Sequence, residues 1–284
     1  MNFTHRTILI TGAARGLGLA YATALAERGA RVVITDRGTD RAGCGTDPGP
    51  VERAAQALRA AGHQVLGHCT ELADEAACQA LVARAVEQFG SLDGVIHNAG
   101  WVGYQPIEQV DAGFVERALA INVQAPLWLC KHAWPHLKAS TAPRVVLTTS
   151  DRAMYACYAQ TGLAAYAAGK MAQLGIMNAL SEEGAEHGIL VNAISPVART
   201  RMWGEAAEPD DLKPQWVVPG VVYLASDACQ VTAQVLRASN GQFVATRFEE
   251  QAGVVYPRDL RGVQAQQPEQ VAGCWGRGLE RVSR

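Results

Sequence analysis

The stretch TGAARGLG at residues 11–18 carries three glycines directly after the apolar residues 7–10 and before an alanine-rich segment. The apolar run predicts a buried strand, and the segment after the glycines has the composition of a helix. A glycine-rich turn between a strand and a helix lets backbone N–H groups approach an anion without an intervening Cβ. Since glycines are also ordinary in tight turns, this motif alone leaves open a phosphate site or a plain turn.

Short β-branched runs alternate with longer amphipathic segments along the rest of the chain. We expect strands near 7–11, 31–35, 64–69, 92–97, 144–149, 189–194 and 234–238. We expect helices near 16–29, 51–62, 74–89, 108–137, 163–186 and 217–226, the fourth of them broken by Pro126 and Pro135. This alternation predicts an α/β fold, a Rossmann-like doubly wound parallel sheet of about seven strands in a single domain.

Two stretches depart from the alternation. The sequence RGTDRAGCGTDPGP at residues 37–50 predicts a long surface loop after the second strand. Beyond residue 248 the periodicity fades. We therefore expect a dinucleotide-binding catalytic domain over residues 1–248 and an irregular C-terminal tail over residues 249–284.

Composition narrows the class of partner. The formal net charge is -2, and charges of both signs are scattered, which is not the pattern of a nucleic-acid or membrane-surface protein. No apolar stretch reaches the ~18 residues of a membrane span, and no basic leader precedes the first strand. We expect a cytoplasmic protein that binds a small molecule. The set Cys130, His132 and His136 lacks a fourth ligand, so no metal site is predicted.

Asp36 follows the second expected strand, eighteen residues after Gly18. An acidic side chain at this place can accept hydrogen bonds from the ribose hydroxyls of a dinucleotide, and it would repel a 2′-phosphate. An aspartate is also a common first residue of a loop. Arg15 and Arg37 weakly favour the opposite interpretation, since either could form an ion pair with a 2′-phosphate.

Four further stretches join the glycine turn: HNAG at 97–100, INV at 121–123, YAAGK at 166–170 and VNAISPVARTRM at 191–202. In order and spacing they resemble the short-chain dehydrogenase/reductase family over about residues 5–247. The resemblance looks closest to the (3R)-hydroxyacyl-CoA dehydrogenase part of peroxisomal multifunctional enzymes. That branch also has a glycine-rich insertion after the second strand and a stretch like LKPQWVVPGVVYL at 212–224.

The Asp36 carboxylate predicts NAD as the cofactor, and the resemblance implies a homotetramer or homodimer. Glu71 stands where the family usually has an aspartate beside the adenine, and Val197 stands where it usually has a glycine. The cofactor-binding residues expected on this basis are Gly12, Arg15, Gly16, Leu17, Gly18, Asp36, Glu71, Leu72, Asn98, Ala99, Gly100, Tyr166, Lys170, Pro196, Val197 and Thr200.

Tyr166 and Lys170 are four residues apart in a helical segment, so their side chains share one face. A phenol with a pKa near ~10 is a poor base at neutral pH, but a neighbouring ammonium favours the phenolate. Such a pair can also be no more than part of a half-exposed helix surface. The resemblance implies that Tyr166 is the general base or acid, that Lys170 lowers its pKa and holds the nicotinamide ribose, and that Asn122 holds a water linked to Lys170.

The family places a serine about thirteen residues before the tyrosine, and here that position is Ala153. Ser150 lies sixteen residues before Tyr166, directly after the fifth expected strand, and a three-residue insertion would reconcile the spacing. We therefore predict Ser150 as the substrate-polarising hydroxyl. Thr161, or no hydroxyl at all, is the alternative.

The resemblance implies hydride transfer between NAD(H) and a secondary alcohol or ketone, and we expect a largely apolar small-molecule substrate. An NADP-dependent ketoreductase and a non-catalytic dinucleotide-binding sensor or scaffold are the alternatives. Five aromatic residues follow expected strand ends: Trp101, Tyr104, Tyr155, Tyr158 and Trp203. They either line the substrate pocket or pack in a lid over the cofactor. Three arginines either meet a substrate carboxylate or phosphate or are surface charges: Arg152, Arg199 and Arg201.

Overall fold

The computed structural model describes residues 1–40, 42–200, 210–262 and 264–279, which belong to two compact units, Met1–Thr246 and Arg247–Arg284. The strands of the first unit are β1 (Thr7–Thr11), β2 (Arg31–Thr35), β3 (Val65–His68), β4 (Gly94–Ile96), β5 (Arg144–Thr148), β6 (Leu190–Val197), β7 (Val235–Ser239) and β8 (Gln242–Thr246). Its α-helices are α1 (Gly16–Ala26), α2 (Gly49–Ala60), α3 (Glu75–Phe89), α4 (Ala112–Leu119), α5 (Ala125–Lys138), α6 (Asp151–Met154), α7 (Ala164–Glu183) and α8 (Val218–Ala225).

The strands form one sheet in the order β3-β2-β1-β4-β5-β6-β7-β8. All neighbours are parallel except β7 and β8, which are antiparallel. The chain order reverses between β1 and β4, and a crevice opens at such a reversal, outside the carboxyl ends of the strands. The predicted doubly wound α/β fold is confirmed, with eight strands where about seven were expected.

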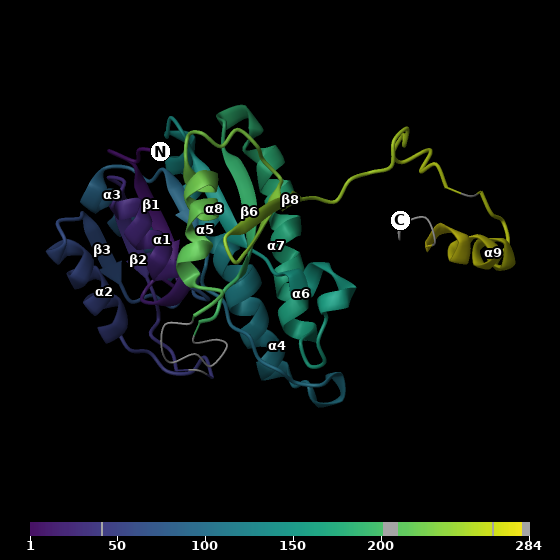
Figure 1. Cartoon of the computed structure of the whole chain (residues 1–284), viewed down its shortest axis with the longest axis horizontal. Coiled ribbons are helices and arrows are strands. Elements are labelled where there is room, and N and C mark those ends of the chain that lie inside the picture. The colour runs from purple at the N-terminus through teal and green to yellow at the C-terminus, as the bar shows by residue number, and fades with distance from the viewer. Residues whose placement is uncertain (41, 201–209, 263, 280–284) are drawn as a thin grey trace. The chain divides into compact units, whose positions relative to one another are not determined.

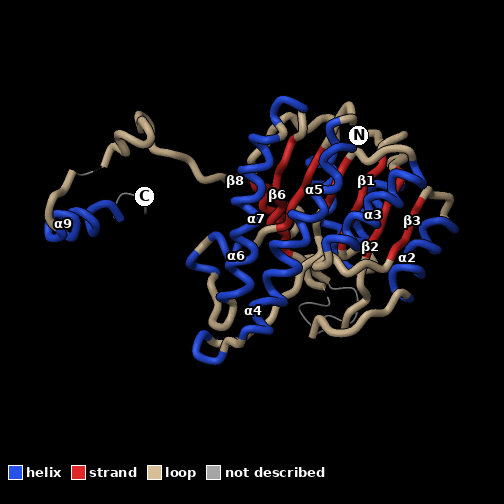
Figure 2. Tube along the Cα trace, turned by 180° about the vertical axis from the view of Figure 1, so that it is seen from behind, coloured by secondary structure: helices blue, strands red, loops and turns tan. Residues whose placement is uncertain are grey.

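Helices cover both faces of the sheet. Figure 1 shows α1 and α8 in front of it, and Figure 2, from behind, shows α3, α5 and α7 on the opposite face. Because both faces are covered, β1 is buried at every position and its side chains alternate between two cores. Ile8 and Ile10 pack with Leu25 of α1 in one core, whereas Leu9 packs with Leu129 of α5 in the other.

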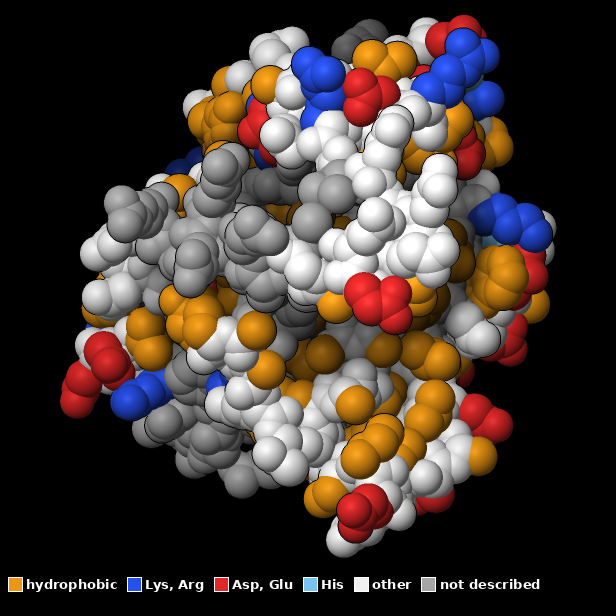
Figure 3. Space-filling view, turned by 90° about the vertical axis from the view of Figure 1, so that its right-hand side faces the viewer, with side chains coloured by type: hydrophobic (Ala, Val, Ile, Leu, Met, Phe, Trp, Pro, Cys, Tyr) orange, Lys and Arg blue, Asp and Glu red, His pale blue; other side chains and the backbone are white. Residues whose placement is uncertain are grey.

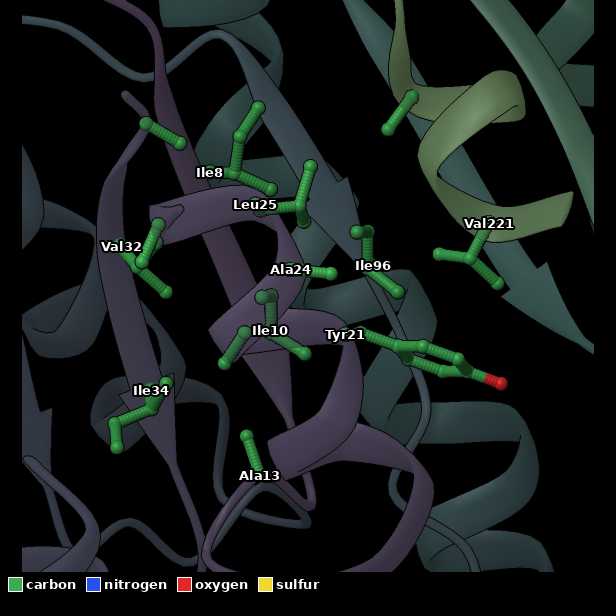
Figure 4. Packing of buried hydrophobic residues seen from close by; sticks show 14 of the residues in the cluster. Ile8, Ile10, Ala13, Tyr21, Ala24, Leu25, Val32, Ile34, Ile96 and Val221 are labelled. Atoms are coloured by element: carbon green, nitrogen blue, oxygen red, sulfur yellow. The ribbon is translucent and has the colours of Figure 1, made fainter. Parts of the chain in front are cut away.

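Tyr21 links α1 to a second helix of the first core. Its side chain is fully buried and reaches from α1 toward Val221 of α8 (Figure 4). The aliphatic side chains of β1 and β2 lie beside α1 in the same view. The first helix, which begins inside the glycine turn, is therefore held by packing along its length.

The strand β8 was missed from the sequence. Asn240 and Gly241 connect it to β7 with φ angles of 51° and 76°, and an Asn-Gly pair with two positive φ values is typical of a two-residue hairpin turn. The pair was thus a readable hairpin signal. β8 itself shows no apolar alternation, since Phe243 and Val244 are 39% and 55% exposed.

The long fourth helix is interrupted at a different place from the one expected. A π-helical turn, Ala120–Gln124, joins α4 to α5. Pro126 lies in the first turn of α5, where a helix needs no backbone N–H, and Pro135 lies inside α5 without ending it. The predicted break at Pro135 is therefore wrong, and the irregularity falls at Asn122.

The second unit contains α9 (Pro268–Leu279) in part of the stretch expected to be irregular. Pro268 at its start and Glu269 in its first turn are usual helix-start residues. Across the described ranges of both units, no helix is both long and apolar enough for a membrane crossing. On the face drawn in Figure 3, acidic and basic side chains are scattered in small groups.

Candidate active site

A cavity of about 680 Å³ lies at the carboxyl ends of the strands, where the chain order reverses. Its walls are the segments that follow β1 to β6, together with one face of α7. Most of the residues predicted from the sequence line it, namely Gly12, Arg15, Gly16, Leu17, Asp36, Glu71, Leu72, Asn98, Ala99, Gly100, Ser150, Tyr166, Lys170, Pro196 and Thr200.

Three predicted residues do not line the cavity. Gly18 lies behind the glycine turn, where a Cβ would be 2.3 Å from the carbonyl oxygen of Gly12. Val197 is the last residue of β6 and pairs with Ser239 of β7. Asn122 is fully buried beneath the cavity wall.

The glycine turn is held in a conformation that leaves its cavity side open. Gly12 and Gly16 have φ angles of 62° and 56°, which a residue with a Cβ rarely adopts. Asn98 Nδ2 donates to the carbonyl oxygens of Thr11 and Gly12, at 3.0 and 3.1 Å, and so ties the turn to the end of β4. Among the described residues, a Cβ at Gly16 would meet only Thr200, at 3.6 Å and beyond. This cradle at the start of α1 fits a pyrophosphate.

Asp36 lies at the next position along the cavity. Its Oδ1 accepts from the Gly38 N–H at 2.8 Å, and its Oδ2 accepts from the Ala14 N–H at 3.2 Å. Both bonds orient the carboxylate, while each oxygen retains a lone pair for a ligand hydroxyl.

The two arginines beside Asp36 have partners within the protein. Arg37 Nη1 forms an ion pair with Glu71 at 2.5 Å, and Arg15 Nη2 donates to the Thr39 carbonyl oxygen at 3.2 Å. Glu71, expected beside an adenine, is thus also the partner of a cation. A 2′-phosphate near Asp36 would have to compete with these contacts.

Ala42, which lies between β2 and α2, contacts Trp101 and Arg117 of the cavity wall. The Ala42 carbonyl oxygen accepts from Trp101 Nε1 at 3.0 Å and from Arg117 Nη1 at 3.1 Å. The Arg117 guanidinium also lies 5.2 Å from the centre of the Trp101 ring. The sequence predicted this loop, but not that Trp101 and Arg117 hold it as part of the cavity wall.

Lys170 lies one turn after Tyr166 on α7, with its Nζ 5.9 Å from the centre of the tyrosine ring. The lysine is 3% exposed, and its Nζ donates to the Thr148 carbonyl oxygen at 2.8 Å. Burial lowers the pKa of Lys170 to about 7.

Tyr166 has a different electrostatic environment from the one expected. Burial raises the pKa of its phenol, while a hydrogen bond with Ser150 and the positive charge of Arg152 oppose this rise. The groups that favour the phenolate therefore come from the segment after β5 rather than from Lys170. The Ser150 hydroxyl lies within hydrogen-bonding reach of Tyr166 despite the longer spacing in the sequence.

The extra residues between Ser150 and Tyr166 are accommodated by α6 and by a 3-10 turn, Ala156–Tyr158. Ser150 is the N-cap of α6, and its Oγ accepts from the Arg152 N–H at 3.3 Å. Thr161, the alternative hydroxyl, is exposed and does not line the cavity.

Asp151, the residue after Ser150, is hydrogen-bonded to residues of β6 and β7. The Asp151 carboxylate accepts from Arg237 Nη2 at 2.7 Å and Nε at 3.0 Å, and from Ser195 Oγ at 2.7 Å. The Arg237 guanidinium lies 4.6 Å from the centre of the Tyr155 ring. Sequence reasoning missed this anchor because its partners are 44 and 86 residues away from Asp151.

Asn122 lies in the π-helical turn. Its Nδ2 donates to the Ala118 carbonyl oxygen at 2.9 Å and to the Trp101 carbonyl oxygen at 3.2 Å. Its Oδ1 is buried and has no hydrogen-bond partner among the described residues. A Cβ at Gly100 would lie 3.2 Å from both Asn122 Oδ1 and Lys170 Nζ, so these two atoms flank one small space. An unsatisfied buried oxygen beside a lysine is a suitable position for a bound water.

Only some members of the predicted aromatic set and of the predicted arginine set line the cavity. Trp101, Tyr104 and Arg152 line the cavity. Tyr155 and Tyr158 pack edge to face, with ring centres 6.0 Å apart, and do not line it. Arg199 pairs with Asp211 at 2.9 Å. Arg201 and Trp203 lie outside the described residues.

Comparisons with known proteins agree with this architecture. Peroxisomal multifunctional enzyme type 2 of Mus musculus is 30% identical over 97% of this chain, which spans only 37% of that enzyme. Cis-4-hydroxycyclohexanecarboxylate dehydrogenase of Sinomonas cyclohexanicum is 32% identical, over 86% of this chain and 98% of its own. The crystal structure of a short chain dehydrogenase from Mycobacterium avium matches with a TM-score of 0.80 and 26% identity, covering 97% of this chain and 96% of that one.

The family model for short chain dehydrogenases matches residues 6–211. Proteins of this family are oxidoreductases that act on small alcohols and ketones with a nicotinamide dinucleotide, and the glycine cradle described above fits that cofactor. From the matched sequence, the sheet order and the cavity together, we conclude that the chain belongs to the short-chain dehydrogenase family.

Proposed function

We propose that the protein transfers a hydride between NAD(H) and a secondary alcohol or ketone carried on a largely apolar body. The observation that carries the proposal is the convergence of Ser150, Tyr166 and Lys170 on one wall of the cavity that also contains the glycine cradle. A proton-transferring group, a hydroxyl donor and a cation beside a dinucleotide site are the parts that this chemistry needs.

In the direction of alcohol oxidation, Tyr166 accepts the proton of the substrate hydroxyl. Ser150 donates a hydrogen bond to the substrate oxygen, and its position at the N-cap of α6 keeps the hydroxyl directed along the cavity wall. Gly12, Gly16 and Asp36 would hold the dinucleotide, which would supply the acceptor for the hydride of the substrate carbon. In ketone reduction the same tyrosine returns the proton.

Lys170 and Asn122 help to move the proton that Tyr166 exchanges with the substrate. A lysine with a pKa of about 7 can both hold and release a proton near neutral pH. The buried Oδ1 of Asn122 would hold a water beside Lys170, which would connect the lysine to further water.

The preference for NAD over NADP rests on Asp36. Its carboxylate lines the cavity, and the two nearby arginines are engaged with Glu71 and with the Thr39 carbonyl oxygen. The Asp36 carboxylate would repel a 2′-phosphate, whereas it could accept hydrogen bonds from ribose hydroxyls.

The substrate body is proposed from the wall around Tyr166. Trp101, Val102 and Ile121 give this part of the cavity apolar surface. The name of the Sinomonas relative specifies a cyclic secondary alcohol, which is a body of this kind. We propose a cytoplasmic homodimer or homotetramer, which light scattering on the purified protein would test.

The proposal is tested with the full chain and a panel of secondary alcohols, each assayed for NADH and NADPH formation, with ketones run in reverse. We expect turnover with at least one alcohol, a clear preference for NAD, and loss of that turnover in Tyr166→Phe. Tighter binding of NADPH than of NADH by calorimetry would favour the NADP-dependent alternative. Tight NADH binding without turnover of any panel member would favour the sensor or scaffold.

A further inference from the structure

His97 is the first residue after β4, and its side chain is fully buried. Its backbone is held by β5, because its N–H donates to the Val146 carbonyl oxygen at 2.9 Å and its carbonyl oxygen accepts from Thr148 Oγ1 at 2.8 Å. The imidazole ring therefore leaves the sheet from a fixed position. The ring does not line the cavity, so it acts only through the groups that it contacts.

The two ring nitrogens of His97 contact two different parts of the site. Nδ1 lies 3.2 Å from Oγ1 of Thr11, the last residue of β1 and the first of the glycine turn. Nε2 lies 3.2 Å from the carbonyl oxygen of Ile121, in the π-helical turn that also contains Asn122. One ring thus connects the segment that forms the phosphate cradle with the segment that carries Asn122.

The hydrogen bonds of Thr11 determine where the proton of this ring lies. Thr11 Oγ1 accepts from the backbone N–H groups of Asn98 at 3.0 Å and of Ala99 at 2.9 Å. A hydroxyl has two lone pairs and one proton, so with both lone pairs occupied its O–H donates to His97 Nδ1. The proton of the neutral ring then lies on Nε2, which donates to the Ile121 carbonyl oxygen.

The neutral ring satisfies both of its partners, whereas a protonated ring would not. A proton on Nδ1 would face the Thr11 hydroxyl, whose lone pairs are already occupied. Burial and, after it, the charge of Lys170 lower the pKa of His97 to about 3, which agrees with the neutral form. His97 is therefore an uncharged connection near neutral pH.

The π-helical turn has to be placed closely because Asn122 fits tightly against α7. A Cβ at Gly169 would be 2.8 Å from Asn122 Cβ, and Asn122 Oδ1 lies beside the small space that Lys170 Nζ also borders. A π-helical turn is a local irregularity within a helix. The bond from His97 to the Ile121 carbonyl oxygen holds this irregular turn from the side of the sheet.

We propose that His97 is a positioning residue that holds the glycine turn and the π-helical turn in register, so that the bound dinucleotide and the proton path to Tyr166 keep one fixed relation. Its effect on cofactor binding passes through Thr11, and its effect on proton transfer passes through Ile121 to Asn122. The part that concerns proton transfer rests on the proposed function, whereas the part that concerns the two hydrogen bonds does not.

Two amide variants separate the two contacts. The shorter side chain of His97→Asn can place its carbonyl oxygen near the Nδ1 position and accept from Thr11. The longer side chain of His97→Gln can place its amide N–H near the Nε2 position and donate to Ile121. Each variant is the matched control of the other, since both bury one amide in place of the ring. Thr11→Val breaks the Thr11 contact from the opposite side and keeps the ring.

Three quantities are measured on the full chain: NADH affinity by calorimetry, hydrogen exchange of Ala120–Gln124 by mass spectrometry, and kcat with an alcohol that is turned over. We expect His97→Gln and Thr11→Val to weaken NADH binding by about 2- to 10-fold, the range for one lost hydrogen bond. His97→Asn should instead speed exchange in Ala120–Gln124 and lower kcat, each by about 2- to 10-fold. In an Asn122→Ala background, His97→Asn should cause a smaller further loss of kcat, because both changes act on one path.

Equal losses of NADH affinity and equal gains of exchange in the two amide variants would overturn the proposal, because they would show only a general loss of stability. Unaltered exchange of Ala120–Gln124 in His97→Asn would overturn it as well. If neither amide variant folds, Thr11→Val decides, since an unaltered NADH affinity in that variant contradicts the link. The crossed pattern of affinity and exchange without turnover of any alcohol would reject the proposed function and keep His97 as the connection.

Discussion

The two ends of the cavity are built in different ways. The end at Gly12, Gly16 and Asp36 is shaped mostly by backbone, with positive φ angles and main-chain hydrogen bonds. The end at Ser150 and Tyr166 is made of side chains from separate elements, and burial together with neighbouring side chains shifts the pKa of Tyr166. The first end depends on the backbone conformation of the segments after β1 and β2, whereas the second depends on how side chains of several elements pack together. Variants at the second end should therefore affect chemistry while leaving cofactor binding intact.

The largest effect is expected from Tyr166→Phe. Removal of the hydroxyl deletes the proposed general acid and base, so turnover should fall by ~10²–10⁴-fold. NADH affinity should remain within about twofold, because the ring and its packing are kept. Steady-state kinetics and calorimetry measure the two quantities. An unchanged rate would show that the side-chain end of the cavity does not carry the chemistry.

Ser150→Ala should have the next largest effect. Loss of a hydrogen-bond donor to the developing charge costs about 2.7–4 kcal/mol of barrier, which is ~10²–10³-fold in turnover. Thr161→Val is the matched control, since Thr161 is exposed and does not line the cavity. A larger loss in the threonine variant would move the hydroxyl role away from Ser150.

Asp36→Ala probes the backbone-shaped end. Without the carboxylate, the repulsion of a 2′-phosphate disappears, and the ratio of NADP to NAD efficiency should rise by about tenfold. The rate at saturating cofactor should stay nearly constant, since the reacting groups are untouched. The ratio of kcat/KM values with the two cofactors tests this. A fall in the rate at saturation without a change in the ratio would contradict the division between the two ends.

Asp151→Asn tests whether the anchor of α6 positions Ser150. The side chains of Asp151 and Arg237 are 16% and 28% exposed, and loss of the charge should reduce stability by about 1–2 kcal/mol. We expect kcat to fall by about threefold to fivefold, because ~1 kcal/mol of barrier is about fivefold in rate. KM for the cofactor should stay unchanged. Arg237→Lys, which keeps the charge, should cause smaller losses of stability and of kcat than Asp151→Asn does. A loss of stability with an unaltered kcat would make the pair structural only.

Much of the fold could be predicted because its signals are local. The alternation of β-branched runs with amphipathic segments predicted the strands from β1 to β7 and the helices around them, since each pattern lies within about twenty residues. The glycine turn and the Tyr166–Lys170 spacing are equally local. β8 also had a local signal, the Asn240-Gly241 turn, although its exposed side chains gave no alternation to read.

The rest required the tertiary structure. The sequence alone determined the doubly wound sheet, the family and which residue types gather at the strand ends, because periodicity and short motifs encode these. Only the folded chain decided that Ser150 reaches Tyr166, that Asp151 is bound by Arg237, and that the 37–50 loop is held at the cavity. It also decided that burial raises the pKa of Tyr166 while the hydrogen bond with Ser150 and the charge of Arg152 oppose that rise. These are contacts between separate elements of the folded chain, and their energies depend on burial and distance, which a linear sequence does not contain.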